Sequence, residues 1–186
     1  MKRTLLRFFV LLVIYLVFAI PFKAMNLIPG FTDVRPVTTL GPIYGIFFGP
    51  VGCFVFALGN LIADIIDDAL RWSSLAGFSA NFFAPYIAWL YWKKFAKRSF
   101  SLRTIQDILL YVLIMVVIAI LETAIIAPAV AIAYPNVNIT LFAWSVFGNT
   151  TIFPIILGIP IIILMQEELG FTPCVARQVS PETEAR

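Results

Sequence analysis

The chain has 186 residues, of which 61% are hydrophobic and 12% are charged, with a mean hydropathy of +0.98 and a formal net charge of +3. Soluble domains are about half apolar and about one quarter charged, so this composition excludes an ordinary soluble globule and predicts an integral membrane protein. The basic residues gather in two short patches beside apolar runs. Such patches are typical of topology-setting charges rather than of a nucleic-acid-binding face, so we expect no nucleic-acid partner.

Histidine is absent, which removes the commonest general base and transition-metal ligand. The two cysteines are Cys53, in an apolar segment, and Cys174, in the polar C-terminal tail. This separation predicts no disulfide framework. Any catalytic mechanism must therefore work without histidine. Our expectation is a protein that is not an enzyme and that holds no metal and no cofactor.

The N-terminal stretch has the basic start of a signal peptide. However, the apolar run over 8–20 is long, and no convincing A-x-A cleavage site follows it. We therefore interpret this stretch as a retained first helix, which ends near Pro21.

Six apolar segments are each expected to form a transmembrane helix in an all-α domain over residues 1–166. They span residues 5–20, 39–48, 51–66, 78–92, 105–133 and 141–165. The second and third are shorter than the roughly 20 residues that cross a bilayer, and Gly49-Pro50 separates them. They are either one hairpin that dips into the membrane or two short helices packed inside the bundle. Residues 167–186 are expected to form a polar, partly disordered cytoplasmic tail.

The distribution of basic residues predicts the orientation. With six crossings, ten basic residues fall on the side of both termini: Lys2, Arg3, Arg7, Lys93, Lys94, Lys97, Arg98, Arg103, Arg177 and Arg186. Only Lys23, Arg35 and Arg71 fall on the other side. The positive-inside rule then places both the N-terminus and the C-terminus in the cytoplasm.

Three glycines in the second segment recur every four residues, at Gly41, Gly45 and Gly49. Small residues at this spacing line one helix face and let another backbone approach closely. We expect packing within the chain to be favoured over a docking surface for a partner.

Polar residues within lipid are costly and are usually functional. The expected topology places Asp64, Asn81, Glu122 and Asn149 in the external half of the bundle. Each also has a structural interpretation: Asp64 pairs with an arginine, the asparagines form interhelical hydrogen bonds, and Asp67 and Asp68 mark a helix end. Glu122 is the hardest to explain structurally, because its neighbours are almost all apolar.

An outward-facing cavity with polar anchors and aromatic walls suits a small organic solute. The expected aromatic neighbours are Phe31, Trp72, Phe82, Phe83, Tyr86, Tyr134 and Trp144. The candidate substrate-binding residues are Arg35, Trp72, Asn81, Tyr86, Glu122, Trp144 and Asn149. Aromatic walls favour a flat heterocycle, and Glu122 favours a cationic or hydrogen-bond-donating group.

One stretch resembles a known family. It contains Arg35-Pro36, Leu40-Gly41-Pro42, the run G-I-F-F-G-P-V-G over 45–52, and Gly59-Asn60 with Asp64. This order resembles the substrate-binding S-components of energy-coupling-factor (ECF) vitamin transporters, in which a short second helix and the third helix often join at an F-G-P-x-G-like turn. The resemblance covers residues 35–64, and beyond them the agreement is one of topology.

The resemblance implies a high-affinity binding subunit for a water-soluble vitamin or related micronutrient in a prokaryotic plasma membrane. The implied partners are a transmembrane coupling protein and two cytoplasmic ATPase subunits, whose ATP hydrolysis drives release of the vitamin inside the cell. The chain departs from the family in its first helix, where Tyr15 and Lys23 flank Ala19 and no A-x-x-x-A docking motif is present.

Two alternatives remain open. Asn60, Asp64 and Asp68 resemble part of the metal-diphosphate motif of intramembrane prenyltransferases, but Leu61 stands where an aspartate is expected. A small secondary transporter or channel using Glu122 as its ion site is the other alternative, although the two halves of the chain show no similarity to each other.

Overall fold

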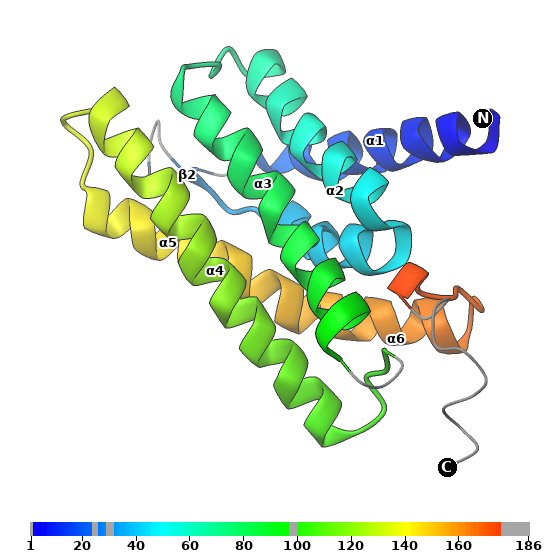
Figure 1. Cartoon of the computed structure of the whole chain (residues 1–186). Coiled ribbons are helices and arrows are strands. Elements are labelled where there is room, and N and C mark those ends of the chain that lie inside the picture. The colour runs from blue at the N-terminus through cyan, green and yellow to red at the C-terminus, as the bar shows by residue number, and fades with distance from the viewer. Residues whose placement is uncertain (1, 24–25, 29–31, 97–99, 176–186) are drawn as a thin grey trace.

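A computed structural model describes residues 2–23, 26–28, 32–96 and 100–175 (Figure 1). Helices dominate the described chain. They are α1 (Lys2–Lys23), η1 (Pro36–Thr39), α2 (Leu40–Ile66), α3 (Ser73–Leu90), η2 (Tyr91–Phe95), α4 (Ile105–Ala133), α5 (Ile139–Phe153), η3 (Pro154–Gly158) and α6 (Ile159–Glu167). The fold is therefore all-helical apart from one small hairpin.

This hairpin lies between α1 and η1, where the sequence predicts only a loop. Strand β1 (Asn26–Ile28) pairs antiparallel with β2 (Thr32–Asp33). Strands of two or three residues are too short to show a repeating hydrophobic pattern, so sequence periodicity could not indicate them.

Helix α2 consists of two halves that fold back on each other at Gly49. Gly49 has φ 63° and ψ −148°, a conformation that glycine adopts without strain, and Pro50 follows it. A Cβ on Gly52 would lie 2.2 Å from the backbone oxygen of Tyr44, and a Cβ on Gly41 would lie 3.4 Å from the Phe56 ring. The second and third expected segments are therefore two short helices that form a hairpin, and the first of them is almost wholly buried in the bundle.

The expected glycine face is filled by the chain itself. A Cβ on Gly45 would lie 2.2 Å from the backbone oxygen of Pro85 in α3, and Gly49 lies against Trp89 and Cys174. These close approaches join α2 to α3 and to the C-terminal segment. The face of Gly41, Gly45 and Gly49 is therefore closed to any partner in this conformation.

The remaining helices differ from expectation mainly at their ends. Helix α3 begins at Ser73 rather than at residue 78. The sequence did not indicate this earlier start, because the first turns of the helix are rich in serine and carry no apolar run. Segments α5, η3 and α6 follow one another directly, and the π-helical turn η3 begins at Pro154, which has no N–H for the helical ladder. The Tyr111 hydroxyl donates a hydrogen bond to the Pro154 carbonyl at 3.1 Å.

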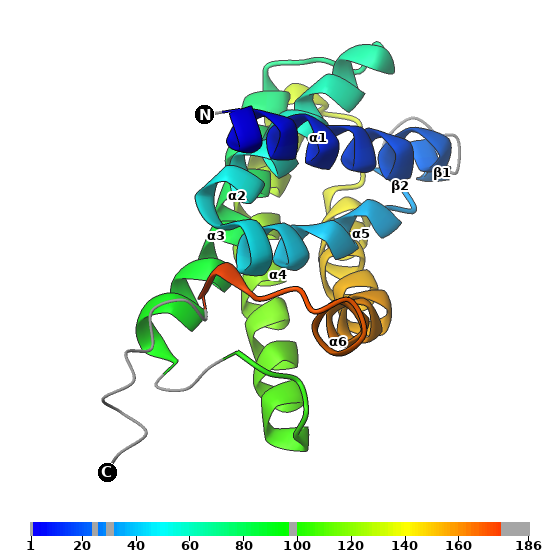
Figure 2. The same cartoon turned by 90° about the vertical axis from the view of Figure 1, so that its right-hand side faces the viewer.

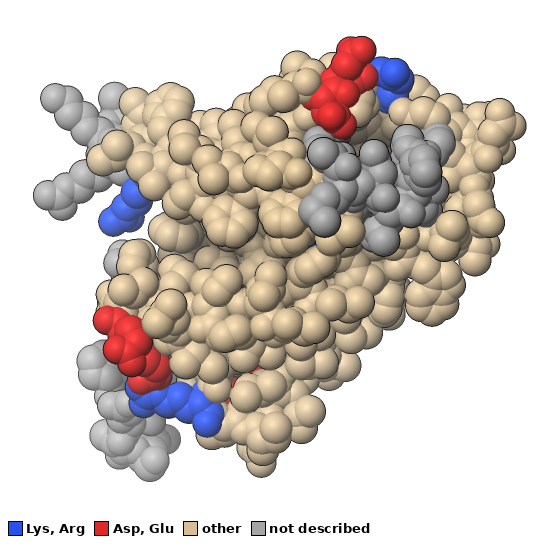
Figure 3. Space-filling model, turned by 180° about the vertical axis from the view of Figure 1, so that it is seen from behind, with Lys and Arg blue, Asp and Glu red and all other residues tan. Residues whose placement is uncertain are grey.

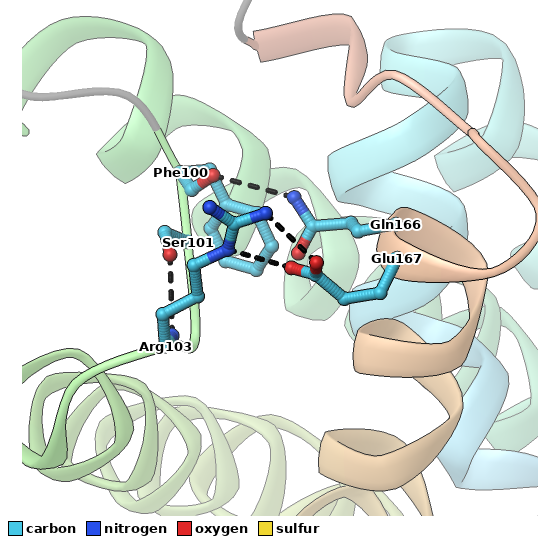
Figure 4. A network of polar contacts seen from close by, with 5 residues as sticks. All are labelled: Phe100, Ser101, Arg103, Gln166 and Glu167. Atoms are coloured by element: carbon cyan, nitrogen blue, oxygen red, sulfur yellow. Dashed lines mark hydrogen bonds and ion pairs between the residues drawn. The ribbon is translucent and has the colours of Figure 1, made fainter.

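One end of the bundle collects the start of α1, the turn in α2, the start of α4 and the end of α6 (Figures 1 and 2). Here Arg103, just before α4, donates two hydrogen bonds to Glu167 at 2.6 and 2.8 Å, and Gln166 donates one to the Phe100 carbonyl at 3.4 Å (Figure 4). Part of the expected tail also packs at this end, because Pro173 and Val175 are buried. Residues 176–186 of the tail lie outside the described residues.

The outer surface of the bundle is apolar. Large aliphatic side chains are exposed along α1 and α4, among them Leu6, Val13, Leu109 and Leu113. On the face shown in Figure 3, the coloured charged side chains lie toward two ends, and the surface between them carries none. This is the surface of a protein that meets lipid along its sides.

Within the described residues, four helical stretches are long and apolar enough to cross a membrane. They are Thr4–Phe22, Pro36–Ile66, Ile105–Ala133 and Ile139–Glu167. Helix α3 is not among them, and the second stretch contains the turn at Gly49. The chain is thus an all-helical protein with four candidate membrane spans, as expected for a multi-pass membrane protein, whereas six spans and cytoplasmic termini stay predictions.

Candidate functional site

A cavity of about 490 Å³ is lined in part by the end of α2, the start of α3 and the end of α4. These helix ends lie together, away from the start of α4 and the end of α6 (Figure 1). Among the described helical segments, η1, α2, α3, α4 and α5 contribute residues to the lining of the cavity. The lining residues with polar or charged side chains are Arg35, Thr38, Asn60, Asp64, Asp67, Asp68, Arg71, Ser73, Ser74, Asn81, Glu122, Tyr134, Asn149 and Thr150. A strongly polar cavity therefore sits within an apolar helical bundle.

Helical spacing explains how these side chains come together. Asn60 and Asp64 lie four residues apart on α2, and Glu122, Ile126 and Val130 are spaced by four on α4. Residues at i and i+4 share one face of a helix. Each of these helices thus turns one polar or mixed face toward the cavity and its apolar faces elsewhere.

Glu122 lies at the floor of the cavity and is only 7% exposed. The Thr150 hydroxyl donates a hydrogen bond to its Oε2 atom at 3.0 Å. At 1.5 Å per residue, Glu122 lies about 16 Å from the end of α4, and Asn149 lies about 15 Å from the start of α5. The two side chains are therefore held at similar depth on neighbouring helices.

Arg35 joins three parts of the fold around the cavity. Its backbone N–H donates to Asn149 Oδ1 at 3.0 Å, and its guanidinium donates to Asn60 Oδ1. The Tyr15 hydroxyl of α1 lies at the limit of hydrogen-bond distance from the same oxygen, at 3.5 Å. Thr38 adds a bond from its hydroxyl to the Asn149 carbonyl at 2.7 Å. This network fixes the segment before η1 against α2 and α5.

The mouth of the cavity is formed by the turn between α2 and α3. Asp67, Asp68 and Arg71 are exposed there. The Arg71 guanidinium donates to the backbone carbonyls of Asp68 at 3.3 Å and Leu70 at 2.7 Å. Its backbone N–H donates to the Ser74 hydroxyl at 3.2 Å, which ties the mouth to the first turn of α3.

Four of the seven candidate residues from the sequence line this cavity, namely Arg35, Asn81, Glu122 and Asn149. Asn81 is buried, and its side-chain amide donates to the Gly77 carbonyl at 2.7 Å. Asn149 makes a hydrogen bond to another segment, from the Arg35 backbone N–H, whereas the Asn81 bond lies within α3 and is not the interhelical bond expected for it. Both asparagines also line the cavity.

The other three candidates lie elsewhere. Trp72 is 53% exposed before α3, and Tyr86 stacks on Phe82 with ring centroids 5.6 Å apart. Trp144 is 67% exposed and lines an apolar groove on the outside of α4 and α5. Among the described residues, the aromatic side chains that line the cavity are Tyr134, which was expected, and Phe142, which was not. Phe82 and Phe83 do not line it, and Phe31 lies outside the described residues.

Sequence reasoning missed the two threonines that complete the polar contacts, Thr38 and Thr150. The run Asn149-Thr150-Thr151 inside an otherwise apolar segment was the available signal for Thr150. Asn60 and Asp64, considered for a diphosphate motif, line the same cavity, as does Asp68. Within the described part of the chain, no group of three or more acidic or cysteine side chains is arranged to hold a metal ion.

Comparison of the chain with protein-family models, with curated proteins and with solved structures gave no match.

Proposed function

We propose that this chain is the membrane-embedded binding subunit of an uptake system for a water-soluble vitamin or related micronutrient. The observation that carries the proposal is the polar cavity of about 490 Å³ sunk into an apolar bundle. Burying so many polar groups at membrane depth is costly, and a ligand that hydrogen-bonds to them offsets part of that cost. A cavity of this size holds a small organic molecule.

The family resemblance supports the same function from a different direction. Three of the residues that carry it, Arg35, Asn60 and Asp64, line the cavity. The turn at Gly49 lies where S-components often join their second and third helices. The resemblance and the cavity were found independently, the first from residue order and the second from geometry.

The proposal assigns the energy supply to partners. The chain has no G-x-x-x-x-G-K-[ST] segment with which to bind ATP phosphates. In the proposed assembly, a transmembrane coupling protein and two cytoplasmic ATPase subunits drive release of the bound solute. The assembly resides in a prokaryotic plasma membrane with both termini of this chain inside and its cavity facing outward.

The test is ligand binding by the purified chain alone. With a panel of water-soluble vitamins and their precursors, one member should raise the thermal unfolding temperature and bind at one molecule per chain, without ATP or an ion gradient. The opposite result is no stabilisation by the panel, together with solute movement down a proton gradient by liposomes that hold only this chain. That result would favour a secondary transporter that uses Glu122. Mg²⁺-dependent turnover of a prenyl diphosphate by the purified chain would instead favour the prenyltransferase-like enzyme.

A further inference from the structure

Carboxylates outnumber cationic groups among the described lining residues of the cavity. Asp64, Asp67, Asp68 and Glu122 are acidic, whereas Arg35 and Arg71 are basic. The formal charges of these six described side chains sum to −2. The cavity therefore presents an excess of negative charge to an entering solute.

Glu122 is the deepest of these carboxylates. Thr150 donates a hydrogen bond to its Oε2 atom, and Glu122 forms no ion pair with any lysine or arginine of the described residues. A carboxylate that is 7% exposed, with one neutral donor in contact and the charge of Arg35 acting only from a distance, is incompletely compensated for the loss of water. A cation that enters the cavity would supply a direct ionic partner.

We propose that the solute is a small organic cation, whose ammonium group or protonated ring nitrogen pairs with Glu122. This inference rests on the proposed binding function and specifies its substrate class. The cationic N–H group donates to Glu122 Oε1, while Thr150 continues to donate to Oε2. The Thr150 oxygen has lone pairs free to accept a second N–H from the same group, because a hydroxyl both donates and accepts.

The rest of the cavity suits such a ligand. Tyr134 and Phe142 give it aromatic surface, which attracts cations as well as flat rings. Asp67, Asp68 and Arg71 at the mouth carry a formal net charge of −1, which favours the approach of cations over anions. Charge therefore favours the same class of ligand at the entrance and at the floor.

The test uses a small-molecule extract of bacterial cells, separated by ion exchange at pH 7 into cationic, neutral and anionic pools. Each pool is added to the purified full chain, and the thermal unfolding temperature is measured. The cationic pool alone should raise it. Stabilisation by the neutral or anionic pool instead would overturn the cation inference and leave the binding function standing. Stabilisation by no pool would contradict the binding function and the inference with it.

Two variants assign the effect to Glu122. Glu122→Gln keeps an oxygen that accepts from Thr150 and removes a buried charge, so the empty protein should unfold at the wild-type temperature or above it. It should bind the stabilising cation about 30-fold more weakly or worse, as expected for loss of one partner from a buried charge pair. Glu168→Gln makes the same chemical change at an exposed residue after α6 and should bind like wild type. Equal affinity of Glu122→Gln and wild type would refute the assignment.

Discussion

Close packing of α2 on α3 at Gly45 gives a prediction that does not depend on any ligand. In Gly45→Ala, the new Cβ would lie 2.2 Å from the Pro85 backbone oxygen and 2.9 Å from its carbonyl carbon. Ordinary contacts begin near 3.4 Å, so the two helices must separate locally by about 1 Å. Backbone atoms cannot rotate aside as a flexible side chain can.

The cost follows from two opposing effects. Overpacking of this kind destabilises by about 1–3 kcal/mol, while alanine in place of glycine inside a helix stabilises by about 0.5–1 kcal/mol. The first effect is larger, so Gly45→Ala should lower the free energy of unfolding by about 1–2 kcal/mol. For a chain of this length, that lowers the unfolding temperature by about 2–8 °C.

Thermal unfolding in detergent measures this change, and Gly148→Ala is the matched control. The Cβ of that variant would meet only Ile152 Cδ1, at 3.8 Å, so its unfolding temperature should equal or exceed that of wild type. If Gly45→Ala proved as stable as Gly148→Ala, the close contact between α2 and α3 would be wrong.

Two further predictions concern the cavity. Asn149→Ala removes the acceptor of the Arg35 backbone N–H and should weaken ligand binding about tenfold or more in an equilibrium binding assay. The control, Asn136→Ala, changes an exposed residue before α5 and should bind like wild type. Unchanged affinity in Asn149→Ala would remove this residue from the site. Trp144→Ala should leave affinity unchanged, because Trp144 lies on the outside of the bundle, and a clear loss of binding would show that the ligand reaches beyond the cavity.

The sequence predicted the features that depend on neighbouring residues, namely the break in α2 and the depth of a residue along its helix. The Gly49-Pro50 pair indicated a break, and the structure breaks at Gly49 because this residue adopts a positive φ. The depth of a residue along its helix could also be predicted from the sequence, since the rise per residue is constant. Counting from the helix ends therefore placed both Glu122 and Asn149 in the external half of the bundle.

Rotation about each helix axis was harder to predict. The apolar pattern of α5 alone does not show whether Trp144 or Phe142 faces the interior, because both are aromatic. Phe142 is seven positions before Asn149 and shares its face, whereas Trp144 is five positions before it and points elsewhere, so this spacing was an available signal for Phe142. The position at which α3 starts could not be predicted from apolar residues either. The first turns of α3 carry serines that line the polar cavity, and they do not form an apolar face.

Filling the cavity tests the central claim most directly. Gly77 lines the cavity, and a Cβ there would have only Asn60 Nδ2 nearby, at 3.7 Å, so Gly77→Phe places a ring in the ligand space without a backbone clash. Ala124→Phe, at an exposed position on α4, is the matched control. Native mass spectrometry after exposure to the bacterial extract should find one small molecule per chain in wild type and in Ala124→Phe, and none in Gly77→Phe. Retention of the molecule in Gly77→Phe would contradict binding in this cavity.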